Sequence, residues 1–255
     1  KIMKNNPPVA IQLYSVRQEL AADFRGTLQK LHDIGYRAVE LAFFYGGLKP
    51  DELAALLHKL QLSACGIYEQ TANLCKEDAE VYQYAAKLNC KYLTMGFSLK
   101  DLEEQFSECQ KMLLKAIQTA AGHGLKICYH AHAHEFQVPA GSNRSFLERL
   151  LQDTPGLLFE ADTAWIKAGN PQSNIPDFLQ AHTAIIPLLH LKDLNSDGKI
   201  TELGNGTIDF PAILNNLSPT VEYLIYEQDY SSIGAMQSAT VSFQYLSNLL
   251  NQQAK

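Results

Sequence analysis

Short runs of apolar residues alternate along the chain with longer segments in which apolar positions recur every three or four residues. A continuous apolar run predicts a buried strand, and the spacing of three or four predicts an amphipathic helix. The apolar runs lie at 9–14, 38–41, 63–68, 91–95, 125–130, 156–162, 187–193 and 222–229. The segments with helical spacing lie at 23–34, 50–60, 76–88, 99–122, 143–152, 174–184, 210–217 and 235–251. The pattern therefore predicts eight strand–helix units.

Eight such units in 255 residues predict a (β/α)8 TIM barrel, in which helices surround a parallel eight-stranded barrel. Glycines just before predicted strands and prolines where helices begin support these boundaries. The alternative is a doubly wound open sheet, which usually has a glycine-rich turn after its first strand. The corresponding turn here reads "YSVRQEL" and has no glycine. Because no linker or low-complexity segment interrupts the pattern, residues 1–255 are predicted to form a single TIM-barrel domain.

Ionisable residues gather near the carboxyl ends of the predicted strands, where the active sites of TIM barrels lie. Such residues are costly inside apolar strands unless they are paired or bound to a cation. They include Glu40, His130, His132, Glu135, Glu160, Asp162, His190, Lys192, Asp193, Glu227 and Asp229. Their position at one end of successive strands indicates one shared site.

Asp162, His190 and Glu227 come from three successive strands, and His130 on the preceding strand would complete a set of four ligands. Carboxylates and imidazoles of this kind suit Mn²⁺, Mg²⁺, Co²⁺ or Zn²⁺. Each residue also has a structural alternative. Asp162 could cap the next helix, His190 could be a core histidine, and Glu227 could form a buried ion pair with Lys192.

The segment "YHAHAHEF" (129–136) places three histidines at every second position and a glutamate directly after them. In an extended strand the three rings would point the same way. We expect His130 at or near the metal, His132 facing the substrate and His134 in a loop outside the site. Glu160 shares a face with Asp162, so we expect it one layer deeper in the barrel, unless the strand is bulged.

Composition narrows the function classes. The net charge is −6 with no basic stripe, which argues against nucleic-acid binding. The sequence contains no run of about 18 apolar residues, so no membrane-spanning helix is predicted. The number of cysteines, five, is odd, and no CxxC pair occurs. We therefore expect neither a disulfide framework nor a structural zinc site. This cysteine usage favours a cytoplasmic location. The chain begins with Lys1, so we expect a trimmed chain from which a secretory leader could have been removed.

Several motifs together resemble the sugar phosphate isomerase/epimerase family of the xylose isomerase-like TIM-barrel superfamily, over almost the whole chain. They are "IQLYSVR", "GYRAVEL", "YHAHAHEF", "FEADTAWIKAGN", "LLHLKD", "ELGNGTIDF" and "YLIYEQD". The resemblance implies a divalent metal at the barrel mouth, with Asp162, His190 and Glu227 on ligand positions.

The first ligand departs from the family pattern. Many relatives have a glutamate in an "ENH"-like motif, whereas this chain has "HAH". Either His130 binds the metal, or Glu135 reaches in, or metal binding is weaker. The resemblance also implies that His132 lies near the substrate and that Lys192 contacts it.

The resemblance implies an isomerase or epimerase that removes a proton next to the carbonyl of a small sugar substrate. A divalent cation would stabilise the enediolate, and Lys192 would neutralise an oxyanion. Glu135, Glu227 and His132 are the acid and base candidates. Glu40 is either a substrate-binding residue or a structural carboxylate, and Tyr14 and Trp165 offer aromatic faces for a sugar or for packing.

Three points stay open at this level. The segment "GNG" at 204–206 is either a phosphate-binding loop or a plain turn, and no cluster of basic residues accompanies it. A keto-sugar or keto-inositol dehydratase or lyase would use the same residues. If His130 in place of the family's glutamate abolishes metal binding, the alternative is a non-catalytic sugar-binding barrel. A homo-oligomer is possible.

Overall fold

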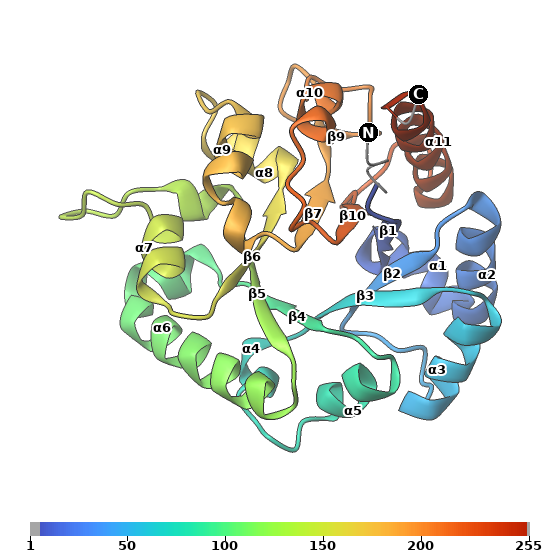
Figure 1. Cartoon of the computed structure of the whole chain (residues 1–255), viewed down its shortest axis with the longest axis horizontal. Helices are drawn as coiled ribbons and strands as arrows, with labels where there is room; N and C mark the ends of the chain where they lie inside the picture. Colours follow the sequence, from blue (N-terminus) through green and yellow to red (C-terminus); the bar gives the residue numbers. More distant parts are fainter. Residues whose placement is uncertain (1–5, 254–255) are drawn as a thin grey trace.

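The computed structural model describes residues 6–253, in which eight parallel strands close into a barrel surrounded by helices (Figure 1). The order around the barrel is β1-β10-β7-β6-β5-β4-β3-β2. The strands are β1 (Val9–Gln12), β2 (Ala38–Ala42), β3 (Ser63–Tyr68), β4 (Tyr92–Met95), β5 (Lys126–His130), β6 (Leu158–Asp162), β7 (Leu188–Leu191) and β10 (Tyr223–Tyr226). This closed sheet confirms the predicted (β/α)8 TIM barrel.

Helices connect successive strands on the outside of the barrel. They are α1 (Arg17–Ala22), α2 (Phe24–Ile34), α3 (Pro50–Lys59), α4 (Thr71–Leu74), α5 (Glu80–Lys87), α6 (Leu99–Gly122), α7 (Phe146–Asp153), α8 (Thr163–Gly169), α9 (Ile175–Ala181), α10 (Phe210–Asn215) and α11 (Ala235–Gln253). Three short 3-10 helices are η1 (Leu13–Val16), η2 (Ala133–Phe136) and η3 (Thr183–Ile185). Asp193–Leu194 (β8) and Ile200–Thr201 (β9) pair as a small antiparallel ribbon outside the barrel.

The segments after the strands contain more short helices than the sequence pattern predicted. The first predicted strand ends at Gln12 and continues as η1. The predicted helix 76–88 corresponds to α5, and α4 is an additional short helix before it. An additional helix, α8, follows β6 directly, so the predicted helix 174–184 corresponds to α9. Helix α8 starts there because Asp162 accepts hydrogen bonds from its first turn.

Inside the barrel, the side chains change from apolar to polar toward the carboxyl ends of the strands. An apolar layer contains Ala10, Ala38, Cys65, Tyr92, Cys128, Leu188 and Ile225. Two residues further along these strands, on the same inward face, stand Gln12, Glu40, Thr94, His130, His190 and Glu227, all buried. Because side chains alternate along each strand, these polar residues all face inward at the same end of the barrel.

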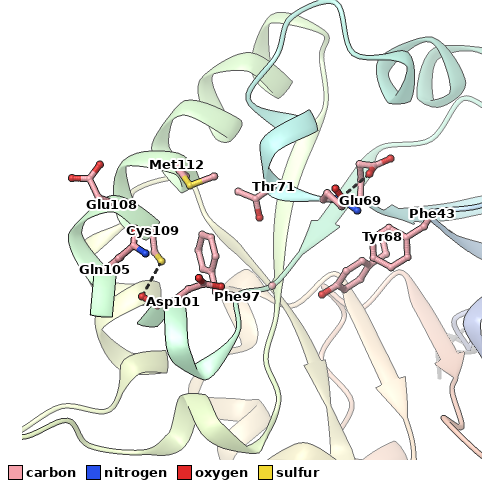
Figure 2. A pocket seen from close by; sticks show the side chains of 12 residues that line it. Phe43, Tyr68, Glu69, Thr71, Phe97, Asp101, Gln105, Glu108, Cys109 and Met112 are labelled. Carbon is pink, nitrogen blue, oxygen red and sulfur yellow. Dashed lines mark hydrogen bonds between the residues drawn. The ribbon is translucent and has the colours of Figure 1, made fainter. Parts of the chain in front are cut away.

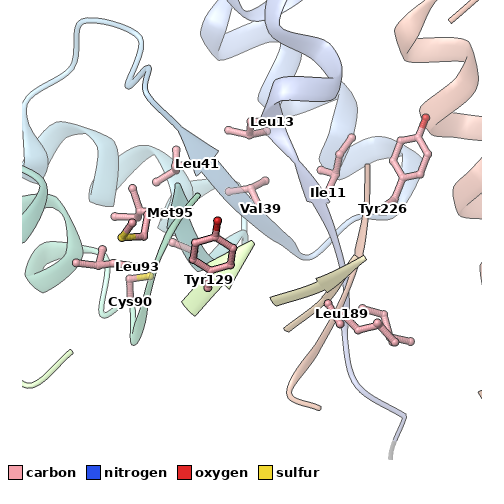
Figure 3. Close-up of a cluster of buried hydrophobic side chains, with 14 of the residues drawn as sticks. Ile11, Leu13, Val39, Leu41, Cys90, Leu93, Met95, Tyr129, Leu189 and Tyr226 are labelled. Carbon is pink, nitrogen blue, oxygen red and sulfur yellow. The ribbon is translucent and has the colours of Figure 1, made fainter. Parts of the chain in front are cut away.

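The opposite face of each strand packs against the surrounding helices. Figure 3 shows part of this core, including the fully buried side chains of Ile11, Val39, Leu93 and Leu189. Since the strands carry apolar residues on both faces over most of their length, they read in the sequence as nearly continuous apolar runs. The exceptions are the polar inward-facing positions at the carboxyl ends.

None of the helices in the described range 6–253 is long and apolar enough to cross a membrane. Lys1, on which the expectation of a removed leader rests, lies outside the described residues.

Candidate active site

Four buried side chains converge at the carboxyl ends of β5, β6, β7 and β10, which are neighbours in the barrel. They are His130, Asp162, His190 and Glu227, and each offers a ligand atom that lies within 4.8 Å of the others. In the register of the sheet, Asp162 pairs with His190. The structure therefore brings together the four residues that the sequence pattern proposed as a metal site.

Asp162 uses its two carboxylate oxygens differently. Oδ1 accepts hydrogen bonds from the backbone N–H groups of Ala164 and Trp165, at 2.8 and 3.0 Å, and so caps α8. Oδ2 is buried, has no hydrogen-bond partner among the described residues, and lies 3.3 Å from Lys192 Nζ. The capping role and the ligand role considered for Asp162 are compatible because they use different oxygens.

The donor set fits a divalent cation. Asp162 Oδ2 is buried without a hydrogen-bond partner among the described residues, which is costly for a polar atom unless something else satisfies it. Burial lowers the pKa of His190, but Glu160, Glu40 and Glu227 outweigh this and raise it well above its ordinary value. The carboxylates around His190 thus create a strongly negative environment in which two imidazoles and two carboxylates suit Zn²⁺, Mn²⁺ or Co²⁺.

A layer of fully buried carboxylates lies beneath these four residues. Glu40 Oε2 lies 2.7 Å from His190 Nε2 and accepts a hydrogen bond of 2.8 Å from Gln12 Nε2. Glu160 Oε2 lies 3.1 Å from His130 Nδ1, although this pair is not aligned as a hydrogen bond. These carboxylates are placed to orient the two imidazoles toward the cavity.

The surroundings shift the pKa values of the two deep carboxyls differently. Burial raises the pKa of Glu40 well above its ordinary value, and the neighbouring Glu160 raises it further. Burial also opposes ionisation of Glu160, but His190 and His130 outweigh it and lower the pKa of that carboxyl. The pKa values of the two carboxyls therefore shift in opposite directions. Glu160 occupies the deeper layer expected from its shared face with Asp162, and no register shift is recorded in β6.

Lys192 is buried beside the four candidate ligands. Its Nζ lies 2.9 Å from Glu227 Oε2, 2.8 Å from Asp229 Oδ2 and 3.3 Å from Asp162 Oδ2. Burial lowers the pKa of Lys192, but these three carboxylates outweigh it and hold the ammonium charged. The ammonium also lies 4.8 Å from the centre of the Trp165 ring.

The histidine row does not continue as a strand, so the three rings are not arranged on one strand face. β5 ends at His130, and His132 stands at the start of η2. His134 Nε2 lies 3.1 Å from the Phe97 carbonyl oxygen and 3.2 Å from Glu135 Oε1. These contacts anchor His134 in the loop.

His132 lies at the edge of the cavity above the four ligand candidates. Its Nδ1 has no hydrogen-bond partner among the described residues. Burial, with help from the charges of His130 and Lys192, lowers the pKa of His132 to about 3. The imidazole is therefore neutral.

Glu135 is fully buried and turned away from that cavity. Oε1 accepts a hydrogen bond of 2.8 Å from the Tyr129 hydroxyl, and Oε2 accepts one of 2.8 Å from the His132 backbone N–H. It joins His132 and His134 in a separate cluster and not the four ligand candidates. The geometry therefore places Glu135 where it holds the loop in shape, and not where the acid–base or fourth-ligand role expected from the sequence needs it.

The candidate active site opens into a cavity of about 260 Å³. Its lining residues are Gln12, Tyr14, Ala42, Phe43, Tyr68, His130, His132, His190, Glu227 and Asp229. Tyr14 is thus on the cavity wall, as expected for substrate contact, whereas Glu40 lies beneath it. Trp165 lines an adjacent open groove together with His132 and His134.

The loop "GNG" is occupied by a carboxylate of the protein itself. Asp193 Oδ2 accepts hydrogen bonds of 3.0 Å from the N–H groups of Gly204 and Gly206, and Oδ1 accepts from those of Leu194 and Ile208. Asp193 is fully buried. The N–H groups that would receive a phosphate are therefore already satisfied, and the loop is a structural turn.

The sequence profile of the xylose isomerase-like TIM barrel family matches residues 28–239, most of the chain. The chain belongs to this family. The match confirms the resemblance drawn from the motifs. No curated protein sequence matches the chain.

Solved structures of other proteins share the fold. A sugar phosphate isomerase/epimerase from Parabacteroides distasonis is 21% identical with a TM-score of 0.76, covering 95% of this chain and 98% of that one. The probable 3-DHS dehydratase AsbF from Bacillus anthracis is 14% identical with a TM-score of 0.73, covering 94% and 99%. The IolI protein, solved with a bound zinc atom, is 12% identical with a TM-score of 0.71, covering 96% and 98%. At identities of 12% to 21%, these similarities establish a shared fold and nothing further.

Within this xylose isomerase-like barrel, sequence reasoning assigned no role to several residues of the site. Gln12 and Thr94 support the deep carboxylates, and Phe43 and Tyr68 form a wall of the cavity. In the register of the sheet, Gln12 pairs with Glu40, and Thr94 pairs with Cys128, which stands two residues before His130 on the same strand face. Strand parity could have identified these two, whereas Phe43 lies beyond the end of β2, where parity no longer applies.

Proposed function

We propose that the protein is a divalent-metal-dependent isomerase or epimerase that acts on a keto-sugar through an enediolate intermediate. The observation that carries the proposal is the convergence of His130, Asp162, His190 and Glu227 beneath a cavity that also exposes a neutral histidine. Family membership supports it, because the structural neighbours include proteins described as an isomerase/epimerase and a dehydratase.

The four converging residues would hold the cation. When bound, a divalent cation supplies positive charge that stabilises the enediolate oxygens. The remaining work falls to the residues around it. Glu40 and Glu160 fix the orientation of the two ligand imidazoles from below, and Asp162 is itself held in place by the first turn of α8.

His132 is the residue best placed to move the proton. Its ring is neutral, its Nδ1 has no partner among the described residues, and it reaches the cavity. Lys192 holds a permanent positive charge close by, which favours a substrate oxygen that becomes negative during the reaction. Glu135 acts through His132: it fixes the backbone at the start of η2 and so positions the ring.

Exchange of substrate hydrogen with solvent tests the proposal directly. The purified protein, loaded with Mn²⁺, would be incubated in D₂O with a panel of keto-sugars and keto-inositols and followed by NMR. We expect the hydrogen next to the carbonyl of at least one member to exchange faster than with free Mn²⁺, and a chelator to stop the exchange. No exchange across the panel with metal bound would favour a sugar-binding barrel, and exchange followed by loss of water would favour a dehydratase.

A further inference from the structure

A second cavity adjoins the candidate active site. It has a volume of about 370 Å³ and lies between the end of β3, the start of α4 and the first half of α6. Phe43 and Tyr68 line both cavities, so the two spaces share a wall. Figure 2 shows Tyr68 and Thr71 on one side of this second cavity and Asp101, Cys109 and Met112 of α6 on the other.

The shared wall contains an aromatic residue in an unusual backbone conformation. Phe43 has a φ of 56°, in the left-handed region that bulky side chains rarely adopt, and its side chain is exposed. Its backbone N–H donates to the Tyr68 carbonyl oxygen at 3.3 Å, and its ring packs edge-on against the Tyr68 ring at 5.2 Å. Such a conformation costs on the order of 1–3 kcal/mol and persists at sites where the surroundings fix it. It holds two aromatic rings at the boundary between the cavities.

The second cavity combines aromatic walls with hydrogen-bond acceptors. Phe43, Tyr68 and Phe97 supply apolar faces. Asp101 and Glu108 supply carboxylates, and Gln70, Thr71 and Gln105 supply neutral polar groups. Glu69 also lines the cavity, but its oxygens already accept hydrogen bonds from Gln70, Asn73 and Tyr45. Carboxylates accept hydrogen bonds from hydroxyl groups, while aromatic faces pack against the C–H faces of a sugar ring. This lining suits a molecule that carries many hydroxyl groups on an apolar skeleton.

Phosphate does not fit this environment. Of the residues that line the two cavities, none is a lysine or an arginine. Lys192 is surrounded by three carboxylates, and Arg17 donates to the carbonyl oxygens of Tyr14 and Asp229. In "GNG", the N–H groups of Gly204 and Gly206 donate to Asp193, and that of Asn205 donates to the Glu202 carbonyl oxygen. Apart from a cation bound at the candidate metal site, a phosphate dianion would therefore meet carboxylates and no free basic side chain.

We infer that the second cavity is a subsite for an uncharged, hydroxyl-bearing group attached to the reacting sugar. The substrate is then an unphosphorylated glycoside, with one ring at the candidate metal centre and a second sugar ring beyond Phe43 and Tyr68. This inference rests on the proposed function, because it takes the reacting ring to lie over His130, Asp162, His190 and Glu227.

Ligand binding without turnover tests the subsite. The Mn²⁺-loaded protein would be titrated by calorimetry with glucose, glucose 6-phosphate, glucosamine and a panel of glucosyl disaccharides of different linkage. We expect at least one disaccharide to bind tenfold or more tightly than glucose, and glucose 6-phosphate to bind more weakly than glucose. Tightest binding of the phosphate or of the amine, or no gain from any second ring, would overturn the inference.

A matched pair of variants locates the second ring. Thr71 lines the cavity, whereas its exposed neighbour Ala72 does not. Thr71→Trp should fill the cavity and remove the disaccharide's advantage over glucose, while Ala72→Trp should keep it. Gln105→Trp, from the opposite wall, provides a second blocking variant if Thr71→Trp folds poorly. Retention of the advantage in a folded blocking variant would place the second ring elsewhere.

The two proposals fail in different ways. If disaccharides bind as expected but no keto-sugar or keto-glycoside exchanges hydrogen in D₂O, the enolising function is rejected and the subsite stands. If simple keto-sugars exchange hydrogen but a second ring never improves binding, the subsite is rejected and the enolising function stands.

Discussion

Asp162 shows how one residue can serve the fold and the candidate metal site together. Its Oδ1 caps α8, and its Oδ2 faces Lys192 and the other candidate ligands. Two substitutions separate these roles. Asp162→Asn keeps an oxygen for the cap but loses the negative charge, and Asp162→Ala loses both.

We expect Asp162→Asn to weaken metal binding by roughly tenfold or more with a small change in stability, because asparagine is as good an N-cap as aspartate. Asp162→Ala should also lose about 1 kcal/mol of stability, the usual contribution of an N-cap. Elemental analysis and urea denaturation of the metal-free proteins would measure the two effects. Full metal content in both variants would place the metal elsewhere.

His132 and His134 form a second natural comparison at the residue scale. Their rings stack at 5.7 Å, yet His132 reaches the active-site cavity while His134 is tied to the Phe97 carbonyl. His132→Ala should lower hydrogen exchange by about 10²-fold or more, the scale of a positioned acid–base group, and should retain metal. His134→Ala should have a much smaller effect on exchange. Equal losses in the two variants would contradict this assignment.

At the scale of elements, η2 explains why Glu135 lies where it does. The predicted alternation of the histidine row ends with β5, and the 3-10 turn then directs Glu135 under the loop, where Tyr129 and the His132 backbone bind it. The carboxylate serves as the acceptor that shapes the turn. Removing this carboxylate should therefore change the conformation of the loop more than it changes metal binding.

Glu135→Gln replaces one of the two acceptor oxygens by an N–H₂ group, which then faces the donor that this oxygen bound, either the Tyr129 hydroxyl or the His132 backbone N–H. Because this leaves buried polar groups unsatisfied, we expect a loss of about 1–3 kcal/mol in stability. Hydrogen exchange should slow while metal content stays at the wild-type level. Denaturation, exchange and elemental analysis of one preparation would check this. Loss of metal in the variant would instead make Glu135 a ligand and would demote His130.

The strands could be predicted from the sequence far better than the loops that complete the site. Apolar runs locate the strands, and strand parity sends Glu40, His130 and His190 inward, because these signals depend on residues within a regular element. Parity fails once a strand ends. The orientations of the Glu135, Asp193 and Phe43 side chains depend on the turns in which they lie. The hydrogen bonds that shape those turns cannot be read from a repeating pattern in the sequence.

At the scale of the whole molecule, the barrel is held at both ends by polar contacts. At the end opposite the candidate active site, Tyr92 of β4 donates a hydrogen bond of 2.7 Å to Glu222 Oε1, just before β10, and Lys91 Nζ lies 3.0 Å from Oε2. β4 and β10 are not neighbours in the sheet, so these contacts cross the barrel floor. They link the two halves of the barrel independently of the metal.

This cross-barrel contact should depend on pH. Burial opposes ionisation of Glu222, but the hydrogen bonds from Tyr92 and Lys91 outweigh it and lower the pKa of that carboxyl. A lowered folded-state pKa gives stability that is present above the ordinary glutamate value of about 4.3 and is lost as the pH falls through the folded-state value. Because the side chain is 38% exposed, we expect less than about 1 kcal/mol.

Glu222→Gln should therefore destabilise the protein at pH 7 and make its stability less sensitive to pH below about 4.3. Urea denaturation of both proteins at pH 7, 5 and 3.5 would measure this. The exposed Glu103, on the outer helix α6, provides a control when changed to glutamine. A Glu222→Gln variant with the same pH dependence as the wild type would show that the contact does not form in solution.

Metal binding should stabilise the barrel at the carboxyl ends of its strands, where the candidate metal site lies. The four candidate ligands come from four neighbouring strands, and the cation would bind only the folded barrel. A metal present at 100 times its dissociation constant adds about 2.7 kcal/mol. For a protein of this size each kcal/mol raises Tm by about 2–4 °C, so we expect a rise of roughly 5–10 °C. Thermal scans with Mn²⁺, Zn²⁺ and Co²⁺, each reversed by chelator, would measure it. At the same metal concentration, Asp162→Asn should reduce the rise to about half or less, because its metal binding is at least roughly tenfold weaker, while Glu222→Gln should keep the full rise. An unchanged Tm at saturating concentrations of all three metals would reject the candidate metal centre.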